Sequence, residues 1–304
     1  MKILCLHGYG TGPEVLKHQL SGLTREADSS WEFHFLSGEV ECPPAPGIEN
    51  AFPPPYYCWT QSFDAETVDA AHGLIEEAIE EHGPFDGVLG FSQGAAILAS
   101  FLLEDAAATA TAATAATAAT AAAQDEHGHD AKRRPPFQFA IFCSPTIPCT
   151  ADPDYTRLVY GTLSNEDQER LQSGQAEQIA QLPDPARAVT EEFITFATAV
   201  EPVTRKAASS FFHRSRPLDR LPAALHPDVL PIRLSIPTLP IRGANDIPNM
   251  DDFVACIRSF CGGSQCQRTV LHSAGHDFPK SGPEVRQLLS AMESVILQSQ
   301  SLTQ

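Results

Sequence analysis

Short, nearly continuous apolar runs alternate along the chain with stretches in which apolar residues recur every three or four positions. The apolar runs predict strands at 3–6, 31–36, 86–90, 137–143, 239–243 and 268–272. The amphipathic stretches predict helices at 13–26, 65–81, 93–104, 251–260 and from 283 onward. Strands that are apolar on both faces are typical of a parallel sheet covered by helices. The pattern therefore predicts an α/β fold with a doubly wound, mostly parallel sheet, as a single domain over residues 1–304.

One interruption of this alternation is a low-complexity segment. Residues 106–123 contain only alanine and threonine, and a histidine-bearing acidic tail and a basic run follow them. Because no larger apolar side chain is present, the segment has little to bury, and we expect 105–136 to be an inserted, mobile surface segment. His127 and His129 lie in it, and two histidines in such a segment are usually solvated, so no metal site is predicted.

The second interruption, 144–231, separates two predicted strands and carries helical patterns near 165–181 and 186–199. Helical insertions at this point of such a sheet commonly cover the site at the strand ends and limit the size of the substrate. We therefore expect a helical lid here. The alternative is a surface insertion without such a role.

A proline-rich stretch, 37–63, follows the second predicted strand, and its prolines exclude regular structure over most of its length. Its aromatic residues, Tyr57 and Trp59 among them, have two interpretations that stay open. They anchor the loop onto the core, or they form one wall of an apolar acyl-binding pocket. On the second interpretation Tyr57 and Trp59 are candidate substrate-binding residues.

The sequence Gly90-Phe91-Ser92-Gln93-Gly94 stands between an apolar run and a helix that opens with small residues. It fits the pattern G-x-S-x-G, in which a serine occupies a tight strand-to-helix turn. Such a turn leaves no room for side chains two positions away on either side, so both flanking positions require glycine. The helix start also places backbone N–H groups and a positive dipole end beside the serine. Ser92 is therefore the candidate nucleophile.

A glycine-rich loop, 7–12, follows the first predicted strand. Dinucleotide-binding folds also place a glycine loop here, but their G-x-G-x-x-G spacing is absent. We expect this loop to contribute to an oxyanion hole made by the backbone N–H groups of Tyr9 and Gln93, with Gly10 as the alternative to Tyr9. His7 is expected to be structural rather than catalytic.

Two further candidates follow predicted strands at the same edge of the sheet as Ser92. Asp246 comes after the strand at 239–243, and His276 comes after the last one. Functional groups collect at the carboxyl edge of a parallel sheet, and the order serine, aspartate, histidine is that of α/β-hydrolases. His276 would take the serine proton, and Asp246 would orient the imidazole. The rivals are Asp251 for the acid, at an expected helix start, and His272 for the base, within the last strand.

Charge and cysteine content narrow the function classes. The formal net charge is −18, from 38 acidic and 20 basic residues, and such a surface repels nucleic acid and anionic membranes. The eight cysteines include no C-x-x-C pair, and several lie in apolar runs, which favours buried thiols in a reducing compartment. We find neither a signal-peptide pattern nor a stretch of about 20 apolar residues. We therefore expect a soluble, cytoplasmic protein without nucleic-acid or membrane partners.

Four blocks of the sequence, taken together, resemble the FSH family of serine hydrolases, which includes small eukaryotic esterases and fungal thioesterases from polyketide clusters. The blocks are residues 3–10, 83–96, 136–142 and 275–276. The resemblance implies an α/β-hydrolase fold with a triad at Ser92, Asp246 and His276. The alanine/threonine segment departs from the family pattern, as does Asp277, where family members often carry an apolar residue. The expected lid and the proline-rich loop look most like the fungal secondary-metabolite members.

These observations predict a hydrolase that forms an acyl-enzyme on Ser92 from an acyl ester or thioester, without a metal or a cofactor. The resemblance implies a thioesterase or esterase of fungal polyketide biosynthesis, whose partner would be an acyl carrier domain of a polyketide synthase. The acidic surface disfavours an acidic carrier unless a basic patch, 132–134 or Arg214 with Arg216, docks it. The alternatives are a stand-alone carboxylesterase and a non-catalytic scaffold that binds a ligand or partner.

Overall fold

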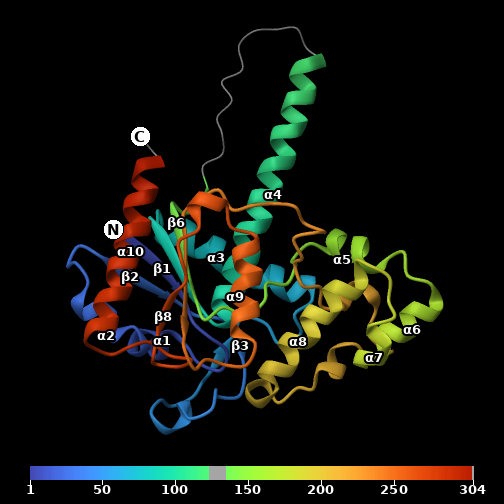
Figure 1. The fold of residues 1–304 in the computed structure, drawn as a ribbon, viewed down its shortest axis with the longest axis horizontal. Helices are drawn as coiled ribbons and strands as arrows, with labels where there is room; N and C mark the ends of the chain where they lie inside the picture. The colour runs from blue at the N-terminus through green and yellow to red at the C-terminus, as the bar shows by residue number, and fades with distance from the viewer. Residues whose placement is uncertain (123–134, 303–304) are drawn as a thin grey trace.

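The computed structural model describes residues 1–122 and 135–302. This part of the chain is built around a parallel sheet with the strand order β2-β1-β5-β6-β7-β8 (Figure 1). The strands are β1 (Lys2–Leu6), β2 (Glu32–Leu36), β5 (Gly87–Phe91), β6 (Phe139–Cys143), β7 (Thr238–Gly243) and β8 (Val270–His272). A small antiparallel pair, β3 (Val40–Glu41) and β4 (Tyr57–Cys58), lies in the proline-rich loop. The predicted α/β fold with a mostly parallel sheet is confirmed.

Helices cover both faces of this sheet (Figure 1). One face carries α1 (Pro13–Gln19), α2 (Ser21–Glu26) and α10 (Pro283–Leu302). The other face carries α3 (Ala65–His82), α4 (Gln93–Ala122) and α9 (Met250–Ser259). The chain runs from β1 outward to β2 and then crosses back to β5 on the other side of β1, so the sheet is doubly wound.

Successive residues of the central strands enter two separate cores. In β1, Ile3 and Cys5 pack toward α1, α2 and α10, while Leu4 and Leu6 pack toward α3 and α4. All four side chains are fully buried. Because neighbouring side chains of a strand point to opposite faces, a strand covered on both faces must be apolar at every position. This is why β1 appears in the sequence as a continuous apolar run.

Helix α4 extends well beyond its predicted end. It was expected to stop near Glu104, but it continues to Ala122 and projects away from the sheet, so much of the segment 105–136 is helical (Figure 1). The buried first turns supply the nucleus, and alanine then propagates the helix at little cost. The hydroxyls of Thr111 and Thr114 donate to carbonyl oxygens four residues earlier, at 2.9 Å each. Propensity and continuity with a packed helix thus outweigh the lack of apolar surface.

Among the described residues, one helical segment, Gln93–Thr114 of α4, is long and apolar enough by length and composition to cross a membrane. This finding corrects the expectation that no stretch reaches that length. Half of its most apolar window is buried inside the fold, where α4 contacts β5 and β6. The core helix of a soluble protein passes the same test, so the segment is weak evidence for a membrane span.

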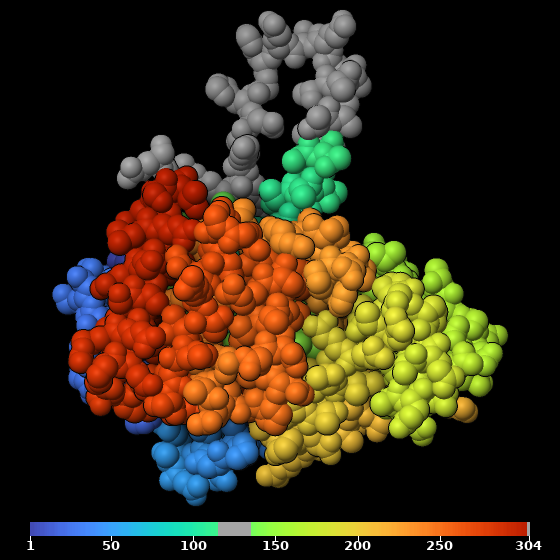
Figure 2. Space-filling view, viewed as in Figure 1, coloured from blue at the N-terminus to red at the C-terminus, as the bar shows by residue number. Residues whose placement is uncertain are grey.

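Within the segment 144–231 the helices form a lobe beside the sheet (Figure 1), coloured yellow-green to yellow in Figure 2. Its helices are α5 (Pro153–Tyr160), α6 (Asn165–Ser173), α7 (Ala176–Ile179) and α8 (Ala186–Thr204). The helical patterns found in the sequence correspond to α6, α7 and α8, whereas α5 was not predicted. Phe193 of α8 packs edge-on against four rings at centroid distances of 5.2 to 5.8 Å, those of Phe63, Phe196, Phe211 and Phe212.

Candidate active site

Ser92 lies between the end of β5 and the start of α4, in the left-handed backbone region with a φ of 54°. Its N–H donates to the carbonyl oxygen of Cys143 at 2.9 Å, which ties the turn to β6. A Cβ on Gly90 would lie 2.5 Å from a Cα atom of α4, and a Cβ on Gly94 would lie 2.5 Å from carbonyl oxygens at the end of β1. Both distances are shorter than any side chain tolerates, which explains the two glycines of the motif.

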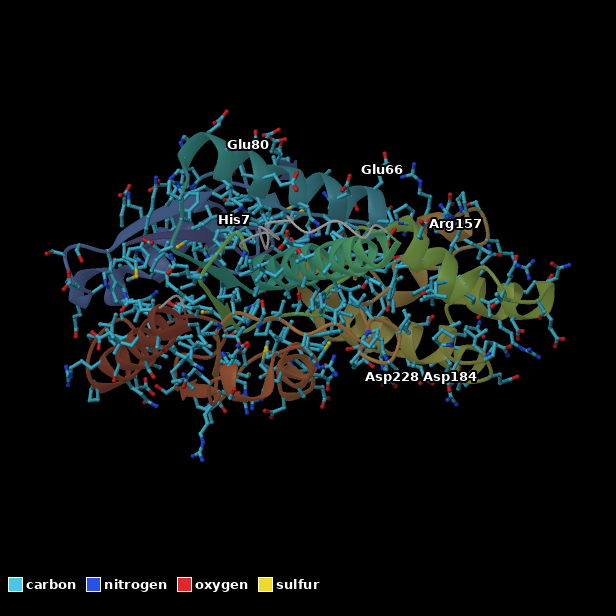
Figure 3. All side chains as sticks on the ribbon, turned by 90° about the horizontal axis from the view of Figure 1, so that it is seen from above. His7, Glu66, Glu80, Arg157, Asp184 and Asp228 are labelled. Atoms are coloured by element: carbon cyan, nitrogen blue, oxygen red, sulfur yellow. The ribbon has the colours of Figure 1, made fainter. Side chains whose placement is uncertain are left out.

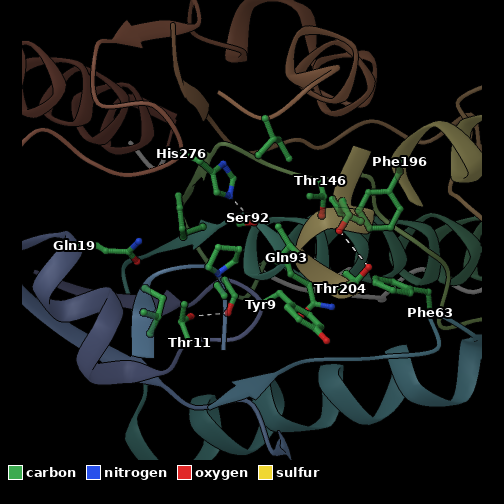
Figure 4. A pocket seen from close by; sticks show the side chains of 18 residues that line it. Tyr9, Thr11, Gln19, Phe63, Ser92, Gln93, Thr146, Phe196, Thr204 and His276 are labelled. Carbon is green, nitrogen blue, oxygen red and sulfur yellow. Dashed lines mark hydrogen bonds between the residues drawn. The ribbon is translucent and has the colours of Figure 1, made fainter. Parts of the chain in front are cut away.

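The three side chains predicted as a triad lie in a hydrogen-bonded series. His276 Nε2 is 2.9 Å from Ser92 Oγ (Figure 4), and His276 Nδ1 is 2.6 Å from Asp246 Oδ1. They come from the loops after β5, β7 and β8, at one edge of the sheet. In this arrangement the imidazole can take the proton of the hydroxyl while the carboxylate fixes the ring and stabilises its positive charge.

Four groups hold the Asp246 carboxylate. One oxygen contacts His276 and accepts the N–H of Ile247 at 2.8 Å. The other accepts the hydroxyl of Ser144 at 2.6 Å and the N–H of Gly243 at 2.9 Å. Burial raises the pKa of Asp246, but the hydrogen bond and charge of His276, with the donors Ser144 and Gly243, bring it below its ordinary value. The carboxylate is therefore ionised at neutral pH.

The two rival candidates lie away from this series. Asp251 is in the first turn of α9 and forms an ion pair with Arg242 at the surface. His272 is the last residue of β8, and its ring stacks on Phe278 with the centroids 6.4 Å apart. Neither rival hydrogen bonds to Ser92 in the described part of the chain.

His7 lies inside the protein, whereas Glu66 and Glu80 stand at the surface (Figure 3). Its Nε2 accepts the N–H of Gly38 at 2.9 Å, and its Nδ1 lies 2.8 Å from the carbonyl oxygen of Gly8. This pattern requires a neutral ring with its proton on Nδ1. Burial lowers the pKa of His7 to about 4. The arrangement suits the expected structural role, because it holds the glycine-rich loop against the proline-rich one.

Tyr57 and Trp59 anchor the proline-rich loop. The indole N–H of Trp59 donates to the carbonyl oxygen of His7 at 2.7 Å, and its backbone N–H donates to the side chain of Gln93 at 3.0 Å. Tyr57 exchanges two backbone hydrogen bonds with Thr11, at 2.8 and 3.2 Å. Neither Tyr57 nor Trp59 is among the described residues that line the cavity beside Ser92. The structure therefore favours the anchoring interpretation over the pocket wall.

The residues whose N–H groups were expected to form the oxyanion hole, Tyr9 and Gln93, both line the cavity. Neither N–H donates to another group within residues 1–122 and 135–302. The N–H of Gly10 instead faces the sulfur of Cys42, whose pKa is lowered first by the thiol of Cys58 and then by this N–H. The geometry therefore favours Tyr9 over Gly10.

A cavity of about 270 Å³ adjoins Ser92 and His276 (Figure 4). Most of its wall is apolar and comes from Pro46, Ile48, Phe63, Phe91, Phe196, Val200, Val203 and Ile247. Its polar side chains include Thr11, Gln19, Thr146 and Thr204. The amide oxygen of Gln19 and the hydroxyl of Thr146 are buried and have no hydrogen-bond partner among the described residues. The cavity can thus accommodate an apolar chain together with a few polar groups.

The roles of Ser144 and of α8 at the site were not predicted from the sequence. Ser144 directly follows β6, so its position at the functional edge was a usable signal. Phe196, Val200 and Val203 recur at helical spacing, but the same spacing is expected of any buried helix face. Sequence alone therefore could not assign them to the cavity.

No metal-binding group of three or more His, Cys, Asp or Glu residues is found in the described ranges. The predicted non-ligands His127 and His129 lie outside those ranges. All eight cysteines are described, and all are free thiols.

Comparison with known proteins identifies a family and individual chains that this protein resembles. The family described as serine hydrolase (FSH1) matches residues 1–288. The serine hydrolase cnsH of Penicillium expansum is 37% identical over 261 residues, which cover 86% of this chain and 97% of the relative. The esterase alnB of Emericella nidulans is 32% identical over 305 residues, which cover 98% of each chain. The solved monoacylglycerol lipase of Paleococcus ferrophilus has 11% identity and a TM-score of 0.47, covering 98% of this chain and 94% of its own.

The family match spans nearly the whole chain, and both curated relatives exceed 30% identity over most of their own length. The protein is thus a member of the serine hydrolase (FSH1) family.

Proposed function

We propose that this protein hydrolyses acyl esters or thioesters through an acyl-enzyme on Ser92, with Asp246 and His276 completing the catalytic triad. One observation carries the proposal: the hydrogen-bonded series from Ser92 through His276 to Asp246 lies at the wall of a mostly apolar cavity. Membership of a serine hydrolase family and relatives named serine hydrolase and esterase support the same reaction class.

The proposed reaction has two halves. His276 Nε2 takes the proton of Ser92 as Oγ bonds to the acyl carbon, and the N–H groups of Tyr9 and Gln93 stabilise the resulting oxyanion, each by about 3 kcal/mol. The bond to the leaving oxygen or sulfur then breaks, and the imidazolium protonates the departing atom. Water next attacks the acyl-enzyme, gives its proton to His276, and releases the acid as Ser92 regains its hydrogen. Asp246 holds the ring throughout and stabilises its cation.

The cavity supports an acyl substrate of limited size. Its apolar side chains suit a hydrocarbon or polyketide chain, and α8 contributes Phe196, Val200, Val203 and Thr204 to it. We therefore propose that the lobe 144–231 acts as the lid, with α8 as the part that meets the substrate. The thioesterase role in fungal polyketide biosynthesis remains a proposal that rests on the sequence resemblance.

The proposed acyl carrier partner has limited support on the surface. Arg216 donates to the Asp64 carboxylate at 2.7 Å and to backbone oxygens of Ser62 and Phe211, so it is engaged within the fold. The other proposed basic patch, 132–134, lies outside the described residues. The described surface therefore supports a small-molecule ester or thioester as the substrate better than a substrate on a docked carrier protein. Cytoplasmic location also remains a proposal, which the free thiols support.

Labelling with a fluorophosphonate probe tests the proposal. We expect the wild-type protein to be labelled at Ser92 and to hydrolyse members of a panel of acyl esters and acyl thioesters, while Ser92→Ala does neither. A well-folded wild-type protein that is not labelled and hydrolyses no member of the panel would favour the non-catalytic scaffold. Turnover of oxygen esters alone would favour the stand-alone carboxylesterase.

A further inference from the structure

The cavity extends to both sides of Ser92. Figure 4 places Phe63, Phe196 and Thr204 on one side of Ser92, and Gln19 and Thr11 on the other. The first side is formed largely by α8 and is dominated by aromatic and aliphatic groups. An acyl chain is expected to occupy that side, because burial of its methylene groups is favourable there. The Gln19 side is then left for the leaving group.

The reaction direction supports the same assignment. In the proposed mechanism His276 must protonate the departing atom, so the leaving group has to lie within reach of its Nε2. The imidazole of His276 lies on the same side of Ser92 as Gln19 (Figure 4). The leaving group therefore extends past His276 toward the end of α1, where Gln19 is the last residue.

Gln19 has an unsatisfied hydrogen-bonding group at this place. Its side chain points from α1 toward the cavity (Figure 4), the residue is only 9% exposed, and its amide oxygen has no partner among the described residues. Thr11, on the same side, is different because its hydroxyl already donates to the carbonyl oxygen of Gly8 at 2.6 Å. A buried amide oxygen without a hydrogen-bond partner destabilises the folded protein. A ligand that supplies a donor here would remove that destabilisation.

We propose that Gln19 determines specificity for the leaving group by accepting a hydrogen bond from an N–H a few bonds from the scissile linkage. The preferred substrate is then an acyl thioester whose thiol arm carries an amide, as the acyl-bearing thiol arms of carrier proteins and coenzyme A do. This proposal rests on the proposed hydrolysis at Ser92 and extends it to the choice of substrate class. In the step concerned the C–S bond breaks, its electron pair stays on sulfur, and the thiolate takes the proton from His276.

A matched pair of substrates tests the proposal on the wild-type protein. The first is the octanoyl thioester of N-acetylcysteamine, and the second is its ketone isostere, in which a methylene replaces the amide N–H. Each kcat/KM is normalised to the rate of hydroxide-catalysed hydrolysis of the same thioester, which removes the difference in thiol acidity. We expect the amide-bearing substrate to be favoured about tenfold, equal to about 1.4 kcal/mol. Equal normalised values would overturn the proposal.

Variants assign the preference to Gln19. We expect Gln19→Leu to lose about tenfold in kcat/KM on the amide substrate and to change the ketone isostere by less than twofold. Val200→Ala, on the α8 side of the cavity, should alter kcat/KM on both substrates by the same factor. Equal losses on both substrates in Gln19→Leu would indicate a structural role and contradict the proposal. Undiminished fluorophosphonate labelling of Gln19→Leu shows that the fold and Ser92 are intact, and turnover of either thioester by the wild type shows that the proposed hydrolysis holds even if the preference does not.

Discussion

The hydroxyl of Ser144 donates to the Asp246 carboxylate at 2.6 Å, on the oxygen that does not face His276. Ser144 is fully buried at the end of β6 and has a φ of 43°. The contact thus joins the loop after β6 to the acid of the proposed triad. We expect Ser144 to be a positioning residue, which acts through Asp246 rather than on the substrate.

Removal of this hydroxyl is expected to weaken the reaction in a pH-dependent way. Ser144→Ala deletes one donor to the carboxylate, so the pKa of Asp246 should rise and kcat/KM should fall by about tenfold. The acid limb of the pH profile of kcat/KM should move to higher pH, because Asp246 is protonated earlier. Ser144→Gly is the control, since glycine adopts the positive φ without strain. Full activity with an unchanged pH profile in both variants would show that the hydrogen bond has no role.

Asp246→Asn tests the proposed acid directly. The amide keeps the shape of the side chain but favours the wrong imidazole tautomer, and the corresponding change in a serine protease lowers kcat by about 10⁴-fold. We expect a loss of similar order here, measured by steady-state hydrolysis of an acyl ester. The matched control is Asp251→Asn, whose carboxylate pairs with Arg242 away from Ser92 and whose loss should leave activity within twofold. A smaller loss in Asp246→Asn than in Asp251→Asn would contradict the assignment.

The buried His7 makes folding stability depend on pH. Burial lowers its pKa from 6.5 to about 4, so the unfolded chain binds more protons at this residue between those values. The free energy of unfolding therefore contains a contribution from His7 that is fully present above pH 6.5 and is lost as the pH falls toward 4. The loss is on the order of 3 kcal/mol. His7→Gln removes this titration and is expected to be less stable than the wild type at pH 7.

Urea unfolding of the two proteins from pH 7 to pH 4 provides the measurement. The stability difference between wild type and His7→Gln should shrink as the pH falls. Burial raises the pKa of Glu104 from its ordinary value of 4.5 to about 7. Above pH 4.5 this residue therefore makes the free energy of unfolding fall as the pH rises, which is opposite to the effect of His7. Burial also lowers the pKa of His72 to about 4. The pH dependences from Glu104 and His72 are the same in both proteins, so they cancel in the stability difference. A difference that stays constant with pH would show that His7 does not titrate in this way.

Val200 tests whether α8 sets the length of the acyl chain. Val200→Phe adds a ring to the cavity wall, so long chains should be excluded while short ones still fit. We expect kcat/KM on a long-chain ester to fall at least tenfold and that on an acetyl or butyryl ester to change little. Leu297→Phe, on the exposed face of α10, is the control for the added ring. Parallel losses on all chain lengths would argue against a size-limiting role of α8.

The elements around Ser92 could be predicted because their sequence signals are local. Gly90 and Gly94 are required by close contacts within a few residues or with the adjacent strand. Asp246 and His276 could be placed because strand ends of a parallel sheet share one edge. The direction and order of the strands were therefore enough to place Asp246 and His276 near Ser92.

Long-range packing decided the remaining features. Tyr57 and Trp59 suited a pocket wall and an anchor equally well, and only their bonds to Thr11, His7 and Gln93 separate the two. The full length of α4 depended on a buried nucleus that composition does not reveal. The role of Ser144 required the position of one loop relative to another. These relationships are set by tertiary contacts, which one sequence does not contain.

The ring cluster around Phe193 has a consequence for how substrate selectivity can change. Lifting α8 would expose several aromatic rings at once, and each costs about 2 kcal/mol to bring into water. We therefore expect the part of the cavity wall that α8 contributes to limit substrate size while staying in place, rather than to open and close. New chain lengths would be gained by exchanging individual wall residues, one methyl or ring at a time, while the helix itself stays in place.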